Sequence, residues 1–233
     1  MQLSMRLQMA VSLAPECKVA ADIGCDHSFL PVYLIQSGLA KRAIACDVNQ
    51  KPLDKARANV EAQGLSDKIE LRLGNGLGPL NTDEPEVVFI CGMGGALICS
   101  ILQTGLEKAL KAKALVLQPQ NHAPMLRRQL HRMGFKIHAE RMVYEGGFFY
   151  TVIVAEPGQE KYTAVEHYEL GKCLIENADE IFIHYLLYTR EKEQRLMSDL
   201  ESRGSTAAQI RLVELKELYA MNTEVLKCLN VDI

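Results

Sequence analysis

The sequence predicts an α/β protein with a seven-stranded, mostly parallel sheet that ends in an antiparallel hairpin, followed by a C-terminal helical extension. Short β-branched segments alternate with amphipathic helical segments over residues 18–133, and no strand pattern follows the hairpin. Hydrophobic residues make up 48% and charged residues 24% of the 233 residues. These proportions are typical of a soluble globular protein and exclude collagen-like and disordered chains.

Five segments rich in β-branched and other apolar residues are expected to form the parallel strands. They are Lys18–Ile23, Arg42–Asp47, Lys68–Leu73, Glu86–Cys91 and Lys113–Gln118. The amphipathic segments between them predict the helices Pro31–Ser37, Pro52–Gln63, Ala96–Leu110 and Pro124–Met133. Because the crossovers between parallel strands share one hand, we expect these helices on both faces of the sheet. A further helix is predicted over residues 3–13, at the edge of the sheet.

After Gly134 two strands flank a glycine turn, which predicts a hairpin of Phe135–Tyr144 and Phe148–Ala155. The Pro and Gly of residues 156–160 mark the expected boundary between a first domain, residues 1–158, and a helical domain, residues 159–233. Three helices are predicted in the second domain, over residues 162–177, 179–202 and 206–229. The last has apolar residues at heptad spacing, which fits a coiled-coil-like antiparallel helical hairpin or a dimerisation arm.

The cysteine content and the charge of the sequence predict the cellular compartment and the kinds of binding partner. The seven cysteines form no Cys-x-x-Cys pair, and we find neither a secretory signal nor an apolar run long enough for a membrane helix. We therefore expect a cytoplasmic protein without disulfides or membrane contact. The net charge is only −3, yet residues 106–141 carry eight basic and two acidic side chains. That excess predicts a phosphate-binding face or, more simply, a solvated helix face.

The residues that follow each predicted strand are the candidates for chemistry, because ligands of open parallel sheets bind beyond the carboxyl ends of the strands. The first strand ends in Asp22-Ile23-Gly24-Cys25-Asp26-His27. A dinucleotide fingerprint would need further glycines, and Asp26 would repel a pyrophosphate, which disfavours NAD and FAD. A cationic ligand without phosphate, such as S-adenosylmethionine, fits better. On the alternative interpretation, the segment is a tight turn that needs one glycine.

The next two strand ends could supply further contacts to such a ligand. Asp47 follows Asp22 by 25 residues and could accept both hydroxyl groups of a ribose, with Val48 beside it. Asn75 and Gly76, after the third strand, could flank an adenine ring. The order of these residues at successive strand ends is more specific than any one of them.

The last two parallel strands end in small residues and in carboxamides. Gly92, Met93 and Gly94 follow the fourth strand, where glycine lets a ligand lie against bare backbone, although Met93 could serve packing alone. Gln120 and Asn121 follow the fifth strand. Their carboxamides suit the edge of a nucleobase, or Asn121 caps the following helix.

Three motifs carry a resemblance to a known family: Asp22-Ile23-Gly24-Cys25-Asp26-His27 with Leu30-Pro31, Cys91-Gly92-Met93-Gly94-Gly95, and Leu117-Gln118-Pro119 with Leu126-Arg127. Over its whole length the sequence resembles the bacterial tRNA (adenine-22-N1)-methyltransferases, the TrmK family. The resemblance implies a Rossmann-like class I methyltransferase fold with S-adenosyl-L-methionine as cofactor. It also implies tRNA as substrate, methylated on N1 of an adenine. The family usually has Asn directly after the proline, where this chain has Gln120 and then Asn121.

The resemblance also implies roles for single residues. The expected cofactor-binding residues are Asp22, Gly24, Asp26, His27, Asp47, Val48, Asn75, Gly76, Gly92, Met93 and Gly94. Adenine N1 is unprotonated at neutral pH and needs no strong base, so the candidate catalytic residues are expected to position the cofactor or the base. They are Asp26, His27, Gln120 and Asn121. The basic segment and the N-terminal helix, and not the resemblance, supply the expected RNA-binding residues, which are Arg6, Arg127, Arg128 and Arg132.

Two other functions stay open at this point. One is a class I methyltransferase that acts on another RNA, on a protein or on a small molecule, and the basic segment argues against the last two substrates. The other is a non-catalytic tRNA-binding protein, against which the intact Asp22, Gly24, Asp26 and Asp47 argue. The six histidines show no metal-ligand spacing, so no metal is expected, and we expect a monomer or a weak homodimer.

Overall fold

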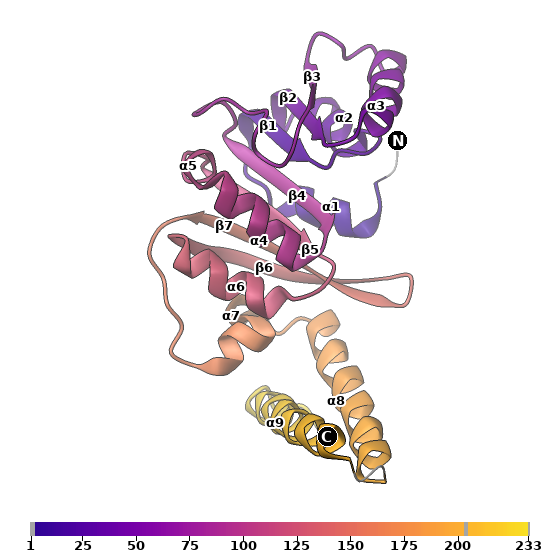
Figure 1. Ribbon diagram of the computed structural model, residues 1–233, viewed down its shortest axis with the longest axis vertical. Coiled ribbons are helices and arrows are strands. Elements are labelled where there is room, and N and C mark those ends of the chain that lie inside the picture. The colour runs from indigo at the N-terminus through magenta and orange to yellow at the C-terminus, as the bar shows by residue number, and fades with distance from the viewer. Residues whose placement is uncertain (1–2, 203–204, 233) are drawn as a thin grey trace. The chain divides into compact units, whose positions relative to one another are not determined.

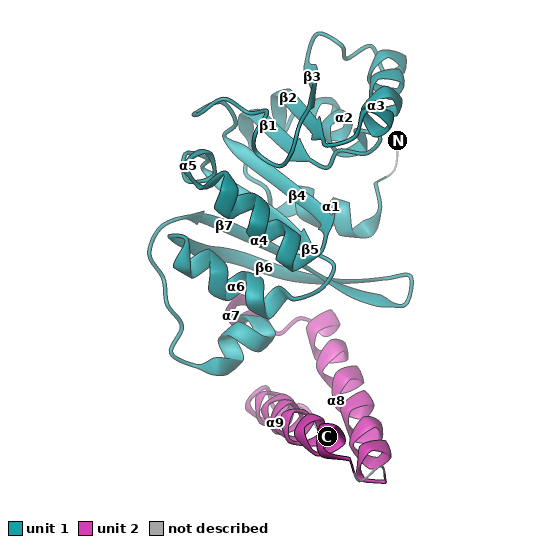
Figure 2. Ribbon diagram, in the orientation of Figure 1, with its two compact units in different colours: residues 1–171 teal, residues 172–233 magenta. Residues whose placement is uncertain are grey.

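The structure of the chain is a computed structural model that describes residues 3–202 and 205–232. It comprises two compact units, residues 1–171 and residues 172–233 (Figure 2). The first unit contains the sheet and its helices, and the described residues of the second form three helices. None of the helices in the described ranges combines the length and apolar character needed to cross a bilayer.

Within the described residues, seven strands form one sheet in the order β3-β2-β1-β4-β5-β7-β6 (Figure 1). Strands β1 to β5 are parallel, and β7 is antiparallel to both β5 and β6. The fold class predicted from the sequence is therefore confirmed. The strands are β1 Cys17–Ile23, β2 Ala40–Asp47, β3 Ile69–Leu73, β4 Val87–Met93, β5 Ala114–Pro119, β6 Phe135–Glu145 and β7 Phe148–Pro157.

Helices cover both faces of the sheet because both faces of the central strands are apolar. Residues of α1 Met5–Leu13, α2 Phe29–Gln36 and α3 Gln50–Ala62 share one core cluster with alternate residues of the strands. Helices α4 Gly95–Thr104 and α6 Ala123–Arg132 pack against each other on the opposite face (Figure 1). Helix α1 contacts β5, β6 and β7, so it lies on the face of the sheet and not at its edge.

The helix expected over Ala96–Leu110 is interrupted at Gly105. It consists of α4 and a short α5, Leu106–Ala109. A Cβ atom on Gly105 would lie 2.7 Å from Cβ of Leu77, so the chain passes too close to Leu77 for any side chain there. This contact joins segments far apart in the sequence, and a helical pattern therefore does not predict the interruption.

The first compact unit extends beyond residue 158, where the sequence predicted a boundary. Residues 159–171 include a π-helical turn, His167–Gly171, where a regular helix had been expected. Carbonyl oxygens of Tyr168, Glu169 and Leu170 accept hydrogen bonds from the Arg127 side chain. Because these bonds attach the segment to α6, it belongs to the sheet-containing unit.

The second unit consists of α7 Lys172–Asn177, α8 Glu180–Glu201 and α9 Thr206–Cys228. Helices α8 and α9 pack on each other as a helical hairpin within one chain. Asp179 and Ser205 cap their N-termini by accepting hydrogen bonds from the amides of Phe182 and Ala208. Asn222, at a heptad position, is buried and donates to Glu193 Oε2 at 2.9 Å. A buried polar pair of this kind favours one register of the two helices.

Candidate active site

Two adjoining hollows lie at the carboxyl ends of the parallel strands, where the strand order reverses between β1 and β4. The larger has a volume of about 500 Å³ and the smaller one of about 360 Å³. Gly24, Cys91 and Gly92 line both, so the hollows meet at the ends of β1 and β4. Together they form the candidate active site.

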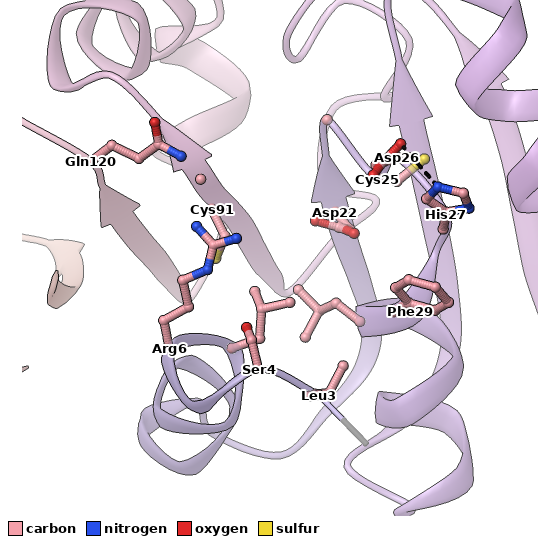
Figure 3. A pocket seen from close by; sticks show the side chains of 14 residues that line it. Leu3, Ser4, Arg6, Asp22, Cys25, Asp26, His27, Phe29, Cys91 and Gln120 are labelled. Atoms are coloured by element: carbon pink, nitrogen blue, oxygen red, sulfur yellow. Dashed lines mark ion pairs between the residues drawn. The ribbon is translucent and has the colours of Figure 1, made fainter. Parts of the chain in front are cut away.

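The Asp22 carboxylate projects into the larger hollow from the end of β1 (Figure 3). Asp22 is only 6% exposed, and burial raises the pKa of its carboxyl to about 7, with the neighbouring Asp47 adding to the shift. Within the described ranges, no hydrogen bond or ion pair reaches this carboxylate. A buried anion without a partner is costly, so the site favours a ligand that brings a positive charge.

The turn after β1 brings its backbone close to β4. Gly24 has a φ of +80°, and a Cβ atom there would collide with the methyl group of Met93. Beyond Gly24, the Asp26 carboxylate lies 3.7 Å from Nε2 of His27, and the His27 ring stacks on Phe29 with centroids 5.2 Å apart. All three side chains stand at one side of the larger hollow in Figure 3.

A hydrogen bond from α3 fixes this turn. Nδ2 of Asn59 donates to the carbonyl oxygen of His27 at 2.8 Å. The side chain of Asp26 is 72% exposed, in contrast to that of Asp22. Two carboxylates four residues apart in one motif thus have opposite environments: that of Asp22 is buried and that of Asp26 is exposed.

The smaller hollow contains the residues expected to hold a ribose and an adenine. Asp47, Val48, Asn75, Gly76 and Met93 all line it. The Asp47 carboxylate is nearly buried and accepts a hydrogen bond from the amide of the residue two positions later, at 2.9 Å. The apolar side chains of Leu97 and Ile101, on α4, also line this hollow and had not been singled out from the sequence.

The two carboxamides after β5 have different surroundings. Gln120 lines the larger hollow, and its Nε2 lies 4.0 Å from the position that a Cβ atom on Gly92 would occupy. Asn121 Oδ1 instead accepts from the amide of Gly95, at the N-terminus of α4. Asn121 and the adjacent Gly94 are not among the described residues that line either hollow. The structure therefore favours Gln120 over Asn121 as the residue that faces a ligand.

Gln118, in β5, was quoted only as part of a motif, and the structure shows what it does. It is fully buried, and its Oε1 accepts a hydrogen bond from the amide of Gly92 at 3.1 Å. This bond holds the end of β4 at the point where the two hollows meet. Its position before Pro119 in the last parallel strand is the sequence signal that could have identified it.

The predicted RNA-binding arginines also differ in their surroundings, and the prediction for Arg127 is wrong. Arg127 is 1% exposed, and its Nε donates to Oε1 of Glu140 at 2.7 Å, so it cannot contact a phosphate. Arg128 is half-buried and pairs with Glu169 at 2.6 Å. Arg132 is exposed, and both line a shallow hollow on α6. Arg6 lines the larger hollow of the candidate active site.

The comparison with known protein families identifies the family to which the chain belongs. The family described as tRNA (adenine(22)-N(1))-methyltransferase, TrmK, matches residues 20–223. The chain belongs to this family. The resemblance inferred from the strand-end motifs is thereby confirmed.

Individual relatives agree with this assignment. A Bacillus subtilis protein named tRNA (adenine(22)-N(1))-methyltransferase is 39% identical over 158 residues, which cover 68% of this chain and 66% of that protein. A Streptococcus pneumoniae structure in complex with S-adenosyl-L-methionine is 35% identical, with a TM-score of 0.86 over 97% of this chain and 100% of that one. The structure of M. capricolum TrmK with S-adenosyl-homocysteine is 27% identical, with a TM-score of 0.84 over 97% and 99% of the two chains.

Membership of a methyltransferase family also bears on what the cleft holds. In the described part of the chain, no group of three or more His, Cys, Asp or Glu side chains is arranged to hold a metal ion. The cleft contains the buried carboxylate of Asp22, with which no described side chain pairs, the glycine backbone of Gly24 and Gly92, and a second acidic residue, Asp47. These features fit a cationic nucleoside cofactor.

Proposed function

We propose that this protein transfers the methyl group of S-adenosylmethionine to N1 of adenine 22 in tRNA. The observation that carries the proposal is the buried Asp22 carboxylate, which lies without a partner among the described residues, in the cleft of a TrmK-family sheet. A pyrophosphate would be repelled there, whereas an ammonium or a sulfonium group would be stabilised. Relatives of similar fold contain S-adenosylmethionine or its demethylated product.

Each hollow would hold a different part of the cofactor. Asp22, Gly24, Asp26 and His27 border the larger hollow and would hold the methionine end. Asp47 and Val48 would hold the ribose, and Asn75 with Gly76 the adenine, in the smaller hollow between the apolar walls of Leu97 and Ile101. Gly92 lies where the hollows meet, Met93 follows it in the smaller hollow, and both would face the sulfur.

The reaction requires the protein to align the methyl donor with adenine N1 and does not require it to transfer a proton first. When bound, S-adenosylmethionine supplies an electrophilic methyl group, and adenine N1 offers an unprotonated lone pair in the plane of the ring. Holding such reactants in line can contribute roughly 7–11 kcal/mol to catalysis. Gln120 projects into the larger hollow near Gly92, where its carboxamide can pair with the edge of the target base.

Asp26 is the carboxylate that would face the charge on the product. N1-methyladenine is cationic, so a carboxylate near it stabilises charge that develops during transfer. Because Asp26 is largely exposed, solvent screens this interaction, and we expect a modest effect. His27 stacks on Phe29 and keeps the turn in place beside the base.

The tRNA is expected to lie across basic side chains at the cleft and on α6. N1 is on the Watson–Crick edge, so a paired or stacked target must first be exposed, at a cost of a few kcal/mol. Arg6 at the cleft, with Arg128 and Arg132 on α6, would bind phosphates and position the RNA. We expect the active protein to be a monomer or a weak homodimer in the cytoplasm.

Mass spectrometry of methylated tRNA tests the proposal. Unmodified tRNA with adenine at position 22 is incubated with the protein and S-adenosylmethionine and then digested. Analysis of the nucleosides identifies the modified base, and analysis of the RNA fragments locates it in the tRNA. The proposal predicts 1-methyladenosine at position 22, and none when guanine replaces that adenine. Methylation only of another RNA, of protein or of small molecules would contradict it.

A further inference from the structure

The β6–β7 hairpin extends beyond the edge of the sheet at which the cleft lies. Strand β7 pairs with β5 as far as Ile153 opposite Leu117, and β5 ends two residues later at Pro119. The hairpin continues to Phe148, so its last three residues, roughly 10 Å of strand, have no β5 residues beside them. Figure 1 shows this projection at the carboxyl ends of the parallel strands. The core of the sheet does not require it.

One face of the projecting tip is aromatic. Side chains alternate along a strand, so Phe148 and Tyr150 lie on one face, while Phe149 lies on the other with Tyr144. The rings of Phe148 and Tyr150 have centroids 6.4 Å apart. Phe148 is 66% exposed, which leaves most of a large apolar ring in contact with solvent. A ring that served only to pack the hairpin would be buried.

Arg6 connects this aromatic face to the cleft. Its guanidinium carbon lies 5.5 Å from the centroid of the Tyr150 ring, and its Nε lies 3.9 Å from Oε2 of Glu145. The same Glu145 accepts a hydrogen bond from the amide of Met5, which attaches α1 to the hairpin. In the other direction, Nη1 of Arg6 lies 3.9 Å from the position of a Cβ atom on Gly92. Arg6 therefore belongs both to the aromatic face and to the transfer end of the cleft (Figure 3).

We propose that Arg6, Phe148 and Tyr150 form a stacking surface, the hairpin platform, for an unpaired tRNA nucleobase next to the target adenine. The inference rests on the proposed function. Extruding an adenine to expose N1 leaves the neighbouring base without one stacking partner. An aromatic face with a guanidinium on it replaces that partner through stacking and cation–π contact, and the positive charge suits the adjoining phosphate.

The absence of tryptophan from the sequence makes a direct test simple. Phe148→Trp places a single fluorescent indole on the platform and keeps a ring that can stack. Tyr144→Trp places the same probe on the opposite face of the same hairpin and is the matched control. With S-adenosyl-homocysteine present, tRNA is expected to quench the fluorescence of the Phe148→Trp protein and to leave that of the Tyr144→Trp protein nearly unchanged.

A kinetic comparison gives the second readout. Phe148→Leu keeps an apolar side chain and removes the ring, so KM for tRNA is expected to rise about 5- to 150-fold. The affinity for S-adenosylmethionine should stay the same, and Phe148→Trp should restore KM. Because stacking releases few counterions, the slope of log affinity against log salt should be unchanged.

The outcomes separate the platform from the proposed function. If the unaltered protein methylates tRNA but Phe148→Leu has an unchanged KM, or both tryptophan probes respond alike, the platform is wrong and the proposed function stands. If the unaltered protein does not methylate tRNA, the proposed function fails and the platform fails with it. Quenching confined to position 148, together with a raised KM for Phe148→Leu, supports the platform.

Discussion

Arg127 and Asp22 are both buried and chargeable, but Arg127 has partners that stabilise the fold, whereas Asp22 lies in the candidate active site without such partners among the described residues. Arg127 is satisfied by Glu140 and by three carbonyl oxygens of residues 168–170, so its charge anchors one segment of the first unit. Asp22 has no such partner in the described part of the chain, and its pKa is raised to about 7 by burial. A paired buried charge helps to hold the fold together. An unpaired buried charge destabilises the folded protein, and a ligand of opposite charge can reduce that free-energy cost.

The largest expected effect is on stability, from Arg127→Ala. Removing the guanidinium breaks the buried ion pair with Glu140, and breaking such a pair typically costs about 3–5 kcal/mol. Urea denaturation should show this loss in the free energy of unfolding. Arg132→Ala, on the exposed side of the same helix, is the control and should change stability by less than about 0.5 kcal/mol. Equal stability of the two variants would show that the buried pair is not an anchor.

Asp22→Asn is expected to have the opposite effect to Arg127→Ala: the protein keeps its stability but binds S-adenosylmethionine more weakly. The substitution removes a buried anion that no described residue neutralises, so the free energy of unfolding at pH 7 should stay the same or rise. The loss of a desolvated charge partner for the cofactor should weaken S-adenosylmethionine binding by at least about 30-fold. Calorimetric titration measures it. Full cofactor affinity in a well-folded Asp22→Asn protein would contradict the role of this carboxylate.

A smaller effect should appear in the salt dependence of tRNA binding. Exposed Arg132 can neutralise a phosphate, so Arg132→Ala should reduce the slope of log affinity against log salt by about one unit or less. Lys41→Ala, at an exposed position on β2, is a charge-matched control and should leave the slope as it is. An unchanged slope for Arg132→Ala would place the RNA away from α6.

The smallest expected effect is that of Asp26→Asn. Solvent screens this exposed carboxylate, so the rate of methyl transfer at saturating substrates should fall less than about fivefold, with little change in cofactor affinity. Single-turnover kinetics measures the step. A loss as large as that of Asp22→Asn would show that Asp26 contacts the reacting groups in the complex.

The sequence predicts the parts of this molecule that depend on local pattern and strand order. The positions of Asp22, Asp47, Asn75 and Gly92 at successive strand ends follow from alternating strands and helices, and the structure places all four at one cleft. The family that the strand-end motifs resemble is confirmed by the family match, and relatives solved with the cofactor support the expected cofactor. Their separate roles in binding remain predictions.

Features that depend on contacts distant in the sequence could not be predicted in the same way. In sequence, Arg127 and Arg128 are equivalent basic residues of one helix, and only the packing of residues 140 and 168–170 makes Arg127 internal. Gln120 and Asn121 are neighbouring carboxamides, and the approach of α4 turns Asn121 toward Gly95. Burial gives these equivalent residue types different roles.

The affinity for S-adenosylmethionine as a function of pH tests the central claim most directly. A cationic ligand prefers ionised Asp22, whose pKa in the free protein is about 7, so affinity should fall as pH falls from 7 to 5. The fall approaches roughly 50-fold if only the ionised form binds. His27 and the acidic residues Asp26 and Asp47 face the same cleft, so the measurement is repeated with Asp22→Asn and with His27→Gln. The account predicts that Asp22→Asn removes most of the pH dependence and that His27→Gln leaves it. A pH dependence that persists in Asp22→Asn, or none in the unaltered protein, would contradict it.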